Sequence, residues 1–307
     1  MKTDPLVSIV IPAYNHGAYL DAAIRSILDQ DYPHVELIVI DDGSTDDTPK
    51  VLERYAGQFH FESQPNSGQV ATLNKGWRMS RGDILAYLSA DDLLLPGAIS
   101  DSVRCLEQNP DAVLVYCDFN LIDPRSRFVR RVSTPDFSYR EMLAKFICPP
   151  GPGAFFTRAA FEKAGVWDAT FRQMLDYEYW LRLGLHGRFI RIPKVLSAFR
   201  VHPTSLTFTT SSPDEPIKII THYFKRADIP DDVRSLENIA LGNAYQVSAQ
   251  LHFRAGSYRA GAAKLKAAYR LRPVNFFTVA LARRMANVMF NRVGHRALWK
   301  LKQLLNR

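Results

Sequence analysis

The sequence predicts an α/β protein with a mostly parallel sheet flanked by helices, followed by an α-helical C-terminal region. One observation is the alternation of apolar runs with segments of helical spacing over the first 119 residues, which is typical of a parallel sheet. A second is that the strongest apolar runs are continuous, as expected for strands buried on both faces. A third is the segment from about residue 211 onward, where helical spacing and basic residues prevail.

The elements of the first half can be assigned in chain order. The run "VSIVIPAY" ends in a turn signal and predicts the first strand, and the spacing of Leu20, Ala23, Ile24 and Ile27 predicts the first helix. By the same criteria, the expected strands are residues 7–14, 35–42, 59–63, 83–89 and 112–119. The expected helices between them are residues 18–30, 48–55 and 68–80.

The second half of this region gives weaker signals. Residues 121–152 have dispersed charges and are expected to be irregular, and the Pro/Gly-rich stretch "CPPGPGAFFTR" suits a rigid loop that lines a pocket. Helices are expected at 158–165 and 171–187, where Tyr179 and Trp180 suit a core or a pocket wall. Residues 189–207 then predict one or two strands, ending near His202.

Composition limits the class of protein. The chain has 307 residues, of which 47% are hydrophobic, which is enough for one large core or two smaller ones. Its three cysteines lack metal-ligand spacing and do not suggest a disulfide framework, so a reducing cytosol is expected. No signal-peptide pattern is visible, and the most apolar late segment is split by Arg283 and Arg284. We therefore expect a cytoplasmic protein without a membrane span.

The net charge of +8 comes from the C-terminal tail. Residues 251–307 contain 13 Lys and Arg and no Asp or Glu, whereas the first 250 residues carry 26 basic and 31 acidic side chains. Residues 240–273 resemble a tetratricopeptide-like helical pair, which should dock on the rest of the chain or on a second protomer in a homodimer. The basic surface beyond it is either a solvated helix face or a contact with an anionic membrane, on the inner face of the plasma membrane. Nucleic acid is not expected as a partner, because the first 250 residues are acidic and no binding module is present.

Polar residues follow each of the three strongest strands. They are Tyr14 and Asn15, Asp41 and Asp42, and Ser89, Asp91 and Asp92. Ligands of open α/β sheets bind at the carboxyl ends of the strands, so these three segments should converge on one crevice. Either aspartate pair alone could instead serve as a helix cap or a turn.

The adjacent carboxylates of Asp91 and Asp92 indicate a cation site, because two like charges facing a pocket repel unless a cation compensates them. Oxygen ligands suit Mg²⁺ or Mn²⁺, and magnesium sites are usually completed by substrate phosphates. The sequence contains neither a Walker-type loop nor a G-x-G-x-x-G motif near the first strand. The pattern therefore indicates a phosphate-bearing substrate in a protein that is neither a P-loop NTPase nor a dinucleotide dehydrogenase.

Four segments together resemble a known family. They are "VSIVIPAYNHGAYLDAAIRSILDQDYPHVELIVIDDGSTDDT", "NSGQVATLNKGWRMSRGDILAYLSADD", "LDYEYWLRL" and "FRVHPTS". In this order they resemble the family 2 inverting glycosyltransferases of the GT-A fold, over residues 6–206. The resemblance implies a glycosyltransferase domain at 1–210, with a nucleotide-binding part at about 1–105 and an acceptor part at 106–210. Residues 211–307 would form a separate basic helical region.

The resemblance also implies which residues bind the nucleotide. Pro12, Tyr14 and Asn15 would line its pocket, while Asp42 would take the edge of uracil or another base with Asp41 supporting it. The D-x-D motif of the family falls on Ser89, Ala90 and Asp91, so this chain lacks the first carboxylate, which puts the ribose-side contact in doubt.

Asp91 is then expected to be the leading metal ligand and to bridge to the diphosphate of the nucleotide. Asp92 would be a supporting or alternative ligand. His202 would contact the metal or the diphosphate, unless it is an ordinary structural histidine. The cofactor implied is a divalent cation, Mn²⁺ or Mg²⁺, which stabilises charge on the leaving diphosphate.

Asp176 matches the catalytic base of the family, with Leu175 in place of the usual preceding acid. A base at this position takes the proton of an acceptor hydroxyl as its oxygen attacks the anomeric carbon. The alternative for Asp176 is a surface carboxylate paired with Arg182 or Arg172.

The function implied is transfer of a sugar from a nucleotide-sugar, a UDP-sugar, to a hydroxyl of a glycan or lipid-linked acceptor in cell-surface polysaccharide synthesis. Two other classes of protein are alternatives to this enzyme. A nucleic-acid binder would explain only the charge of the tail. A catalytically inactive nucleotide-sugar-binding homologue would explain Ser89 and Leu175 as losses of catalytic residues.

Overall fold

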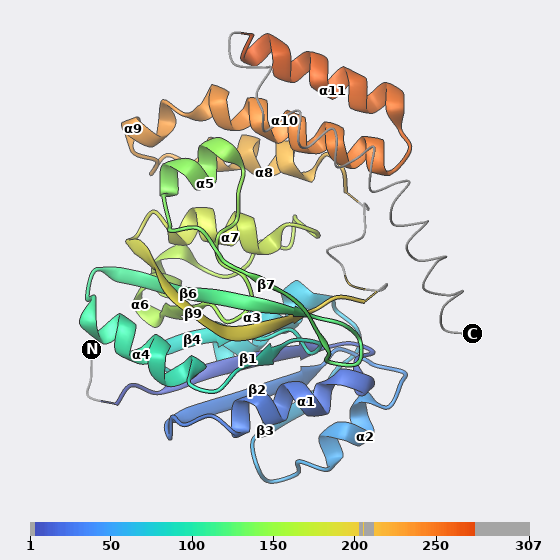
Figure 1. Cartoon of the computed structure of the whole chain (residues 1–307), viewed down its shortest axis with the longest axis vertical. Helices are drawn as coiled ribbons and strands as arrows, with labels where there is room; N and C mark the ends of the chain where they lie inside the picture. Colours follow the sequence, from blue (N-terminus) through green and yellow to red (C-terminus); the bar gives the residue numbers. More distant parts are fainter. Residues whose placement is uncertain (1–3, 203–204, 206–211, 274–307) are drawn as a thin grey trace. The chain divides into compact units, whose positions relative to one another are not determined.

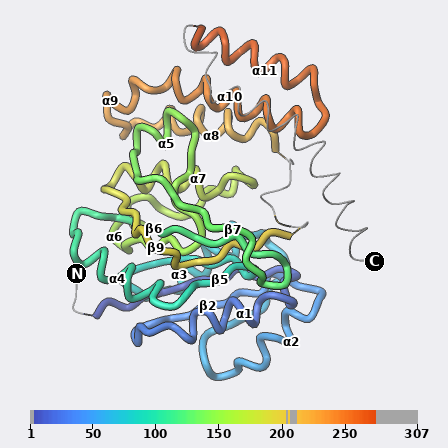
Figure 2. Tube along the Cα trace, in the orientation of Figure 1, coloured from blue at the N-terminus to red at the C-terminus, as the bar shows by residue number. Residues whose placement is uncertain are grey.

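The computed structural model describes residues 4–202, 205 and 212–273. The chain divides into two compact units (Figures 1 and 2). The first unit comprises Met1–Tyr139, Cys148–Thr170 and Leu175–Ser205, and the second comprises Arg140–Ile147, Phe171–Met174 and Leu206–Arg307. The domain boundaries expected from the sequence stay predictions.

One nine-stranded sheet forms the centre of the first unit among the described residues, with the order β3-β2-β1-β4-β8-β6-β9-β5 and β7 paired to β6. Its strands are β1 (Val7–Ala13), β2 (Val35–Asp41), β3 (His60–Ser63), β4 (Ile84–Tyr87), β5 (Leu93–Leu94), β6 (Ala112–Ile122), β7 (Phe128–Val132), β8 (Phe155–Thr157) and β9 (Arg188–Arg200). Strands β3, β2, β1 and β4 run parallel, as do β6 and β9. Strand β8 is antiparallel to β4 and β6, and β5 and β7 are also antiparallel to their neighbours.

Helices cover both faces of this sheet (Figure 1). They are α1 (Gly17–Leu28), α2 (Thr48–Glu53), α3 (Gln69–Met79), α4 (Ala98–Gln108), α6 (Arg158–Ala164) and α7 (Leu175–Leu183). Helices α1, α2 and α4 share one core with Ile9 and Ile11 of β1. Helix α3 packs on the opposite face, so closely that a Cβ on Gly76 would lie 2.4 Å from Val10 Cγ1. The expected α/β sheet flanked by helices is confirmed, as a mixed sheet.

Two expectations for the middle of the chain are wrong. Residues 121–152 are not irregular throughout, since they contain the end of β6, strand β7 and helix α5 (Tyr139–Lys145). The stretch 148–158 is not only a pocket-lining loop, because it includes β8 near the middle of the sheet, where Phe155 and Phe156 are buried. Aromatic side chains that face both sides of a central strand belong to the core. Tyr179 and Trp180 are also buried.

The second unit is helical over its described residues. It contains α8 (Glu215–Tyr223), α9 (Asp231–Arg234), α10 (Glu237–Arg254) and α11 (Tyr258–Leu271), together with most of α5. Helices α10 and α11 form a hairpin that turns at Gly256, whose φ is 83°, and Gly261 of α11 lies against the ring of Phe253. The expected helical C-terminal region is thereby confirmed. The basic tail beyond residue 273, on which the membrane prediction depends, lies outside the described residues.

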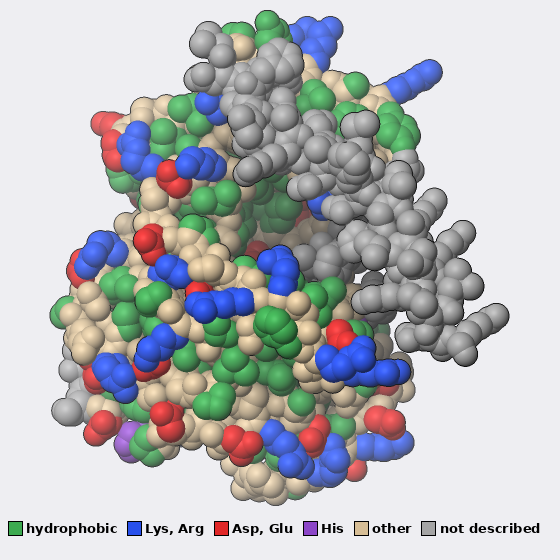
Figure 3. Space-filling model, in the orientation of Figure 1, with side chains coloured by type: hydrophobic (Ala, Val, Ile, Leu, Met, Phe, Trp, Pro, Cys, Tyr) green, Lys and Arg blue, Asp and Glu red, His purple; other side chains and the backbone are tan. Residues whose placement is uncertain are grey.

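Charge on the described surface is mixed in sign. On the face shown in Figure 3, the Lys and Arg side chains of the described residues are interspersed with Asp and Glu. None of the described helices combines the length and the hydropathy of a membrane span.

Candidate active site

The carboxyl ends of β1, β2 and β4 meet at one edge of the sheet, because these strands are parallel neighbours. The loop after β4 carries Asp91 and Asp92, and the loop after β1 carries His16. The end of β9 reaches the same edge, since Asp92 accepts a hydrogen bond from the backbone N–H of Arg200 at 2.8 Å. Four segments that are far apart in the sequence therefore supply the site.

Asp91 lies between two histidines. Its Oδ2 is 2.7 Å from Nε2 of His202 and 3.9 Å from Nε2 of His16. One ligand atom from each of these three residues lies within 4.8 Å of the others, and they are the one such group among the described residues. The structure thus brings together the expected Asp91 and His202 with His16, which the sequence reasoning missed. In the sequence, the only indication of a role for His16 is its position directly after Asn15, at the end of the first strand.

These residues fit a divalent cation. A carboxylate oxygen and two imidazole nitrogens make a donor set that transition metals accept in proteins. In addition, Nδ1 of His16 is buried and has no hydrogen-bond partner in the described part of the chain. No protein acceptor among the described residues therefore fixes the orientation of this ring through Nδ1. Tyr19 packs beside His202, with ring centroids 5.2 Å apart, and limits the movement of that imidazole.

Asp92 occupies a different position from Asp91. Its side chain is buried, and Oδ1 accepts the backbone N–H of Arg200. Burial and then the adjacent charge of Asp91 raise the pKa of Asp92 well above its ordinary value. Asp92 is also not part of the group of three converging ligands. Its geometry suits support of the loop, and its expected role as a metal ligand stays a prediction.

Hydrogen bonds tie the loop after β1 to the loop after β2. The side-chain oxygen of Asn15 accepts the backbone N–H of Thr45 at 2.8 Å, and the backbone N–H of Asn15 donates to Ser44 Oγ at the same distance. Asn15 has a φ of 54°, a left-handed conformation that asparagine tolerates better than most residues. Asp41 accepts the backbone N–H of Ser44 at 3.0 Å. Tyr14, directly before Asn15 in the sequence, is 46% exposed, which leaves its ring available to a ligand.

Asp42 is buried and already has several donors. Its oxygens accept the backbone N–H groups of Ser67 and Gly68, both at 2.8 Å, and the side-chain amide of Gln64 at 2.9 Å. Although desolvation opposes the shift, these hydrogen bonds lower the pKa of Asp42. The carboxylate is therefore ionised and fixed. Whether it takes a base edge stays a prediction, as does the pocket role of the half-buried Pro12, which pairs with Ile40 of β2.

Asp176 lies in the first turn of α7 and has no cationic partner among the described residues. Its Oδ1 accepts the backbone N–H of Tyr177 at 2.8 Å, and the thiol of Cys148 lies 4.0 Å from Oδ2. Desolvation raises the pKa of Asp176, although backbone hydrogen bonds oppose the shift. A carboxylate with a raised pKa accepts a proton more readily, which suits a general base.

One alternative partner of Asp176 is engaged elsewhere. The buried guanidinium of Arg182 donates to Glu178 at 2.7 Å and to the backbone carbonyls of Ala164 and Val166. An ion pair with Arg182 therefore does not account for Asp176.

Tyr87, at the end of β4, is affected electrostatically by residues of two parts of the chain. Desolvation and then the charges of Asp176, Cys148 and Asp92 raise the pKa of Tyr87 well above its ordinary value. The candidate base Asp176 and the buried Asp92 thus both disfavour ionisation of this tyrosine.

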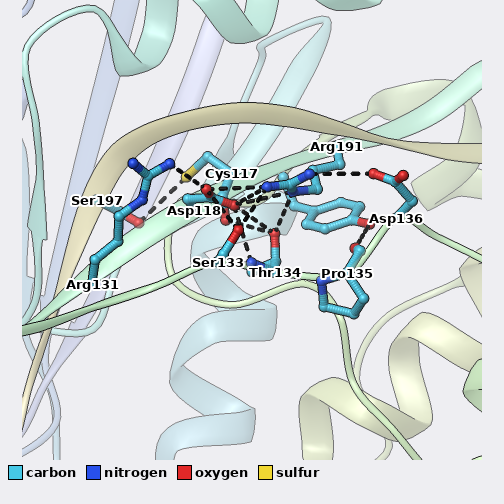
Figure 4. Close-up of polar contacts among 10 residues, drawn as sticks. Cys117, Asp118, Arg131, Ser133, Thr134, Pro135, Asp136, Arg191 and Ser197 are labelled. Atoms are coloured by element: carbon cyan, nitrogen blue, oxygen red, sulfur yellow. Dashed lines mark hydrogen bonds and ion pairs between the residues drawn. The ribbon is translucent and has the colours of Figure 1, made fainter.

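A polar cluster away from this region fixes strands β6, β7 and β9 (Figure 4). Asp118 is fully buried and accepts hydrogen bonds from Arg131 at 2.8 Å, Arg191 at 2.9 Å and the backbone N–H of Thr134 at 3.0 Å. Although desolvation opposes the shift, these donors hold the pKa of Asp118 well below its ordinary value. The cluster joins the base of the β6–β7 hairpin to β9.

The fold and the residues at the carboxyl edge of its sheet define a GT-A glycosyltransferase. The chain belongs to glycosyl transferase family 2, whose family model matches residues 8–169.

Relatives of the chain are themselves named as glycosyltransferases. An uncharacterized glycosyltransferase of Rickettsia typhi is 33% identical over 220 residues, which cover 67% of each chain. The chondroitin synthase of Escherichia coli is 31% identical over 199 residues, which cover 64% of this chain and 29% of that protein.

Solved structures share the fold. Staphylococcus aureus TarS residues 1–349, in complex with UDP-GlcNAc, has a TM-score of 0.64 at 16% identity and covers 86% of this chain and 91% of its own. The mannosyltransferase PcManGT of Pyrobaculum calidifontis, in complex with GDP-Man and Mn²⁺, has a TM-score of 0.63 at 18% identity. The match covers 99% of this chain and 85% of that protein chain.

Proposed function

We propose that this glycosyltransferase transfers a sugar from a UDP-sugar to a hydroxyl of a glycan or lipid-linked acceptor in cell-surface polysaccharide synthesis, with inversion at the anomeric carbon. The observation that carries the proposal is the group of His16, Asp91 and His202 at the carboxyl edge of the sheet. The complexes of TarS with UDP-GlcNAc and of PcManGT with GDP-Man support a nucleotide-sugar donor.

Asp91, His202 and His16 would hold a divalent cation. Two imidazole nitrogens favour Mn²⁺ over Mg²⁺, which prefers oxygen ligands, and PcManGT was solved with Mn²⁺. When bound, the cation would stabilise the negative charge that develops on the leaving diphosphate. Asn15 and Asp41 would keep the loops after β1 and β2 in place for the nucleotide, and Tyr14 would contact it.

Asp176 would act as the base. It takes the proton from the acceptor hydroxyl, whose oxygen forms a bond to the anomeric carbon while the bond from that carbon to the diphosphate oxygen breaks. The products are the glycosylated acceptor and a nucleoside diphosphate, and a single displacement inverts the anomeric centre. No cationic side chain of the described residues contributes to the shifted pKa of Asp176, which supports this role, because an ion pair would lower its pKa and weaken it as a base.

Calorimetry with UDP and GDP, each with and without Mn²⁺, tests the donor and the cation. We expect UDP to bind in a Mn²⁺-dependent manner, and His16→Asn to weaken that dependence while the exposed His34→Asn control leaves it unchanged. Failure of both nucleotides to bind in the presence of any divalent cation would refute the proposal.

A second assay separates the enzyme from an inactive nucleotide-sugar-binding homologue. Mn²⁺-dependent hydrolysis of a UDP-sugar, slow in the absence of acceptor, is expected of the enzyme. Tight binding without any turnover, in the presence of a range of glycan acceptors, would favour the inactive homologue instead.

A further inference from the structure

The β6–β7 hairpin exposes a continuous segment that comprises its turn and most of strand β7. All eight residues from Pro124 to Arg131 are exposed. Phe128 is 65% exposed and Val129 is 56% exposed, and they are the two most exposed large hydrophobic side chains of the described residues. Two adjacent apolar residues of this kind are unusual on a surface that faces only water.

The same segment is strongly basic. It contains Arg125, Arg127, Arg130 and Arg131, and the only acidic residue beside them is Asp123. Asp123 pairs with Arg127, and the buried Asp118 pairs with Arg131. The guanidinium groups of Arg125 and Arg130 form no hydrogen bond or ion pair with the described part of the chain. Their charges are available to a partner.

The hairpin is also firmly held. Its turn is bound by the buried Arg200, which donates to the carbonyl oxygen of Asp123 at 3.1 Å and to Ser126 Oγ at 2.8 Å. The Nε–H of Arg200 donates to the carbonyl oxygen of Asp91 at 2.8 Å. One side chain therefore connects the exposed hairpin with the loop that carries the candidate metal ligand. A rigid element loses less conformational entropy when it binds a partner.

We propose that the turn of the β6–β7 hairpin and the adjoining strand β7, residues 124–131, dock on an anionic phospholipid bilayer. Unpaired arginines match the negative headgroups, while Phe128 and Val129 match the shallow apolar layer beneath them. A soluble polyanion would use the arginines but would leave the apolar pair in water. Where the acceptor is lipid-linked, which rests on the proposed function, this docking holds the Asp91 loop near the membrane surface. The docking itself requires no nucleotide.

The effect of the charges can be stated as a change in affinity. Each arginine near an anionic surface strengthens binding about fivefold at moderate salt. Loss of two of them therefore predicts about 30-fold weaker binding. Insertion of Phe128 and Val129 contributes a part of the membrane affinity that persists when salt screens the charges.

Co-sedimentation of the full chain with vesicles of phosphatidylglycerol and phosphatidylcholine tests the proposal. We expect binding by the wild type, about 30-fold weaker binding by R125Q/R130Q, and binding at the wild-type level by the matched control R104Q/R188Q. Arg104 and Arg188 are also exposed, at 58% and 63%, and each has an acidic partner. F128A/V129A should lose most of the binding that remains at high salt.

Three results would overturn the proposal. One is no binding of the wild type to anionic vesicles, and another is equal binding by R125Q/R130Q and the wild type. The third is R125-dependent and R130-dependent binding to dextran sulfate without binding to vesicles, which would assign the hairpin to a polyanionic glycan. Calorimetry with UDP and Mn²⁺ on R125Q/R130Q should give the wild-type affinity, so failure of the docking and failure of the proposed function remain distinguishable.

Discussion

Replacing Arg200 with methionine should destabilise the first unit substantially. The substitution keeps most of the aliphatic volume and removes the guanidinium, whose carbon also lies 4.8 Å from the ring centroid of Tyr19. The side chain of Arg200 is 1% exposed, so the guanidinium itself is shielded from water.

The size of the effect follows from three hydrogen bonds to the guanidinium, with Asp91, Asp123 and Ser126. A hydrogen bond to a charged group contributes roughly 1.5–3 kcal/mol. The lower end applies because Asp123 and Ser126 reach solvent, which gives about 4–5 kcal/mol for three bonds. Burying the guanidinium also costs desolvation free energy, and its removal relieves this cost. We therefore expect a net loss of about 3 kcal/mol in the free energy of unfolding.

Urea unfolding followed by circular dichroism measures this loss. Arg188→Met is the matched control, because Arg188 is 63% exposed and pairs with an equally exposed Asp111. An exposed ion pair contributes at most about 1 kcal/mol, so the control should unfold near the wild-type midpoint. Arg200→Lys should fall between them, since lysine keeps the charge without the fork of donors. A loss below about 1 kcal/mol for Arg200→Met, at an unchanged m-value, would refute the reasoning.

Three further predictions concern the two candidate groups and the second unit. Asp91→Asn should abolish Mn²⁺-dependent binding of UDP in calorimetry, and an unchanged affinity would remove Asp91 from the metal site. Asp176→Asn should lower turnover by about 10²-fold or more with donor affinity intact, and the wild-type rate should fall as pH drops through a point above the usual carboxyl pKa of about 4. Near-normal turnover of that variant would exclude Asp176 as the base. Although desolvation opposes it, hydrogen bonds from Lys264, His252 and Ser248 lower the pKa of Asp214 to about 2. Stability from this depressed pKa is present above about pH 4 and is lost as pH falls through about 2. Because solvent screens the 44% exposed carboxylate, Asp214→Asn should cost only about 1 kcal/mol at pH 7, and clearly less at pH 2, as thermal unfolding at both pH values would show.

The parallel half of the sheet could be predicted because its strands are long and apolar. Strands β1 and β2 each have seven residues. Because both of their faces are buried, their sequences are continuously apolar, whereas a helix of the same length that is buried on one side would show polar residues at intervals. The missed elements lack such a signal. Strand β7 reads "FVRRV" and is exposed along most of its length, and β8 has only three residues, so its place in the sheet depends on its neighbours β4 and β6.

The candidate site was predictable only where the chemistry is local. Two adjacent aspartates at the end of a strand indicate a cation by themselves, whereas a single histidine such as His16 carries no spacing pattern. His16 gains its significance from the approach of Asp91 and His202, which is a property of the folded sheet. Likewise, the pair of aspartates alone does not distinguish Asp91 from Asp92. The resemblance to the family ranked Asp91 first, and in the structure His202 lies beside Asp91 while the backbone of Arg200 donates to Asp92.

The place of β9 in the sheet has a consequence for biosynthesis. Strand β9 lies between β6 and β5 although it is the last strand among the described residues, and His202 follows its end by two residues. As the ribosome synthesises the chain from its N-terminus, β1, β2 and β4 can pair early, but β6 keeps one open edge until residue 200 has emerged. An unpaired strand edge invites aggregation, so the nascent chain should depend on chaperones in this interval. His16 and Asp91 acquire their third partner only at its end, so a chain that stalls before β9 should lack one ligand of the proposed cation site.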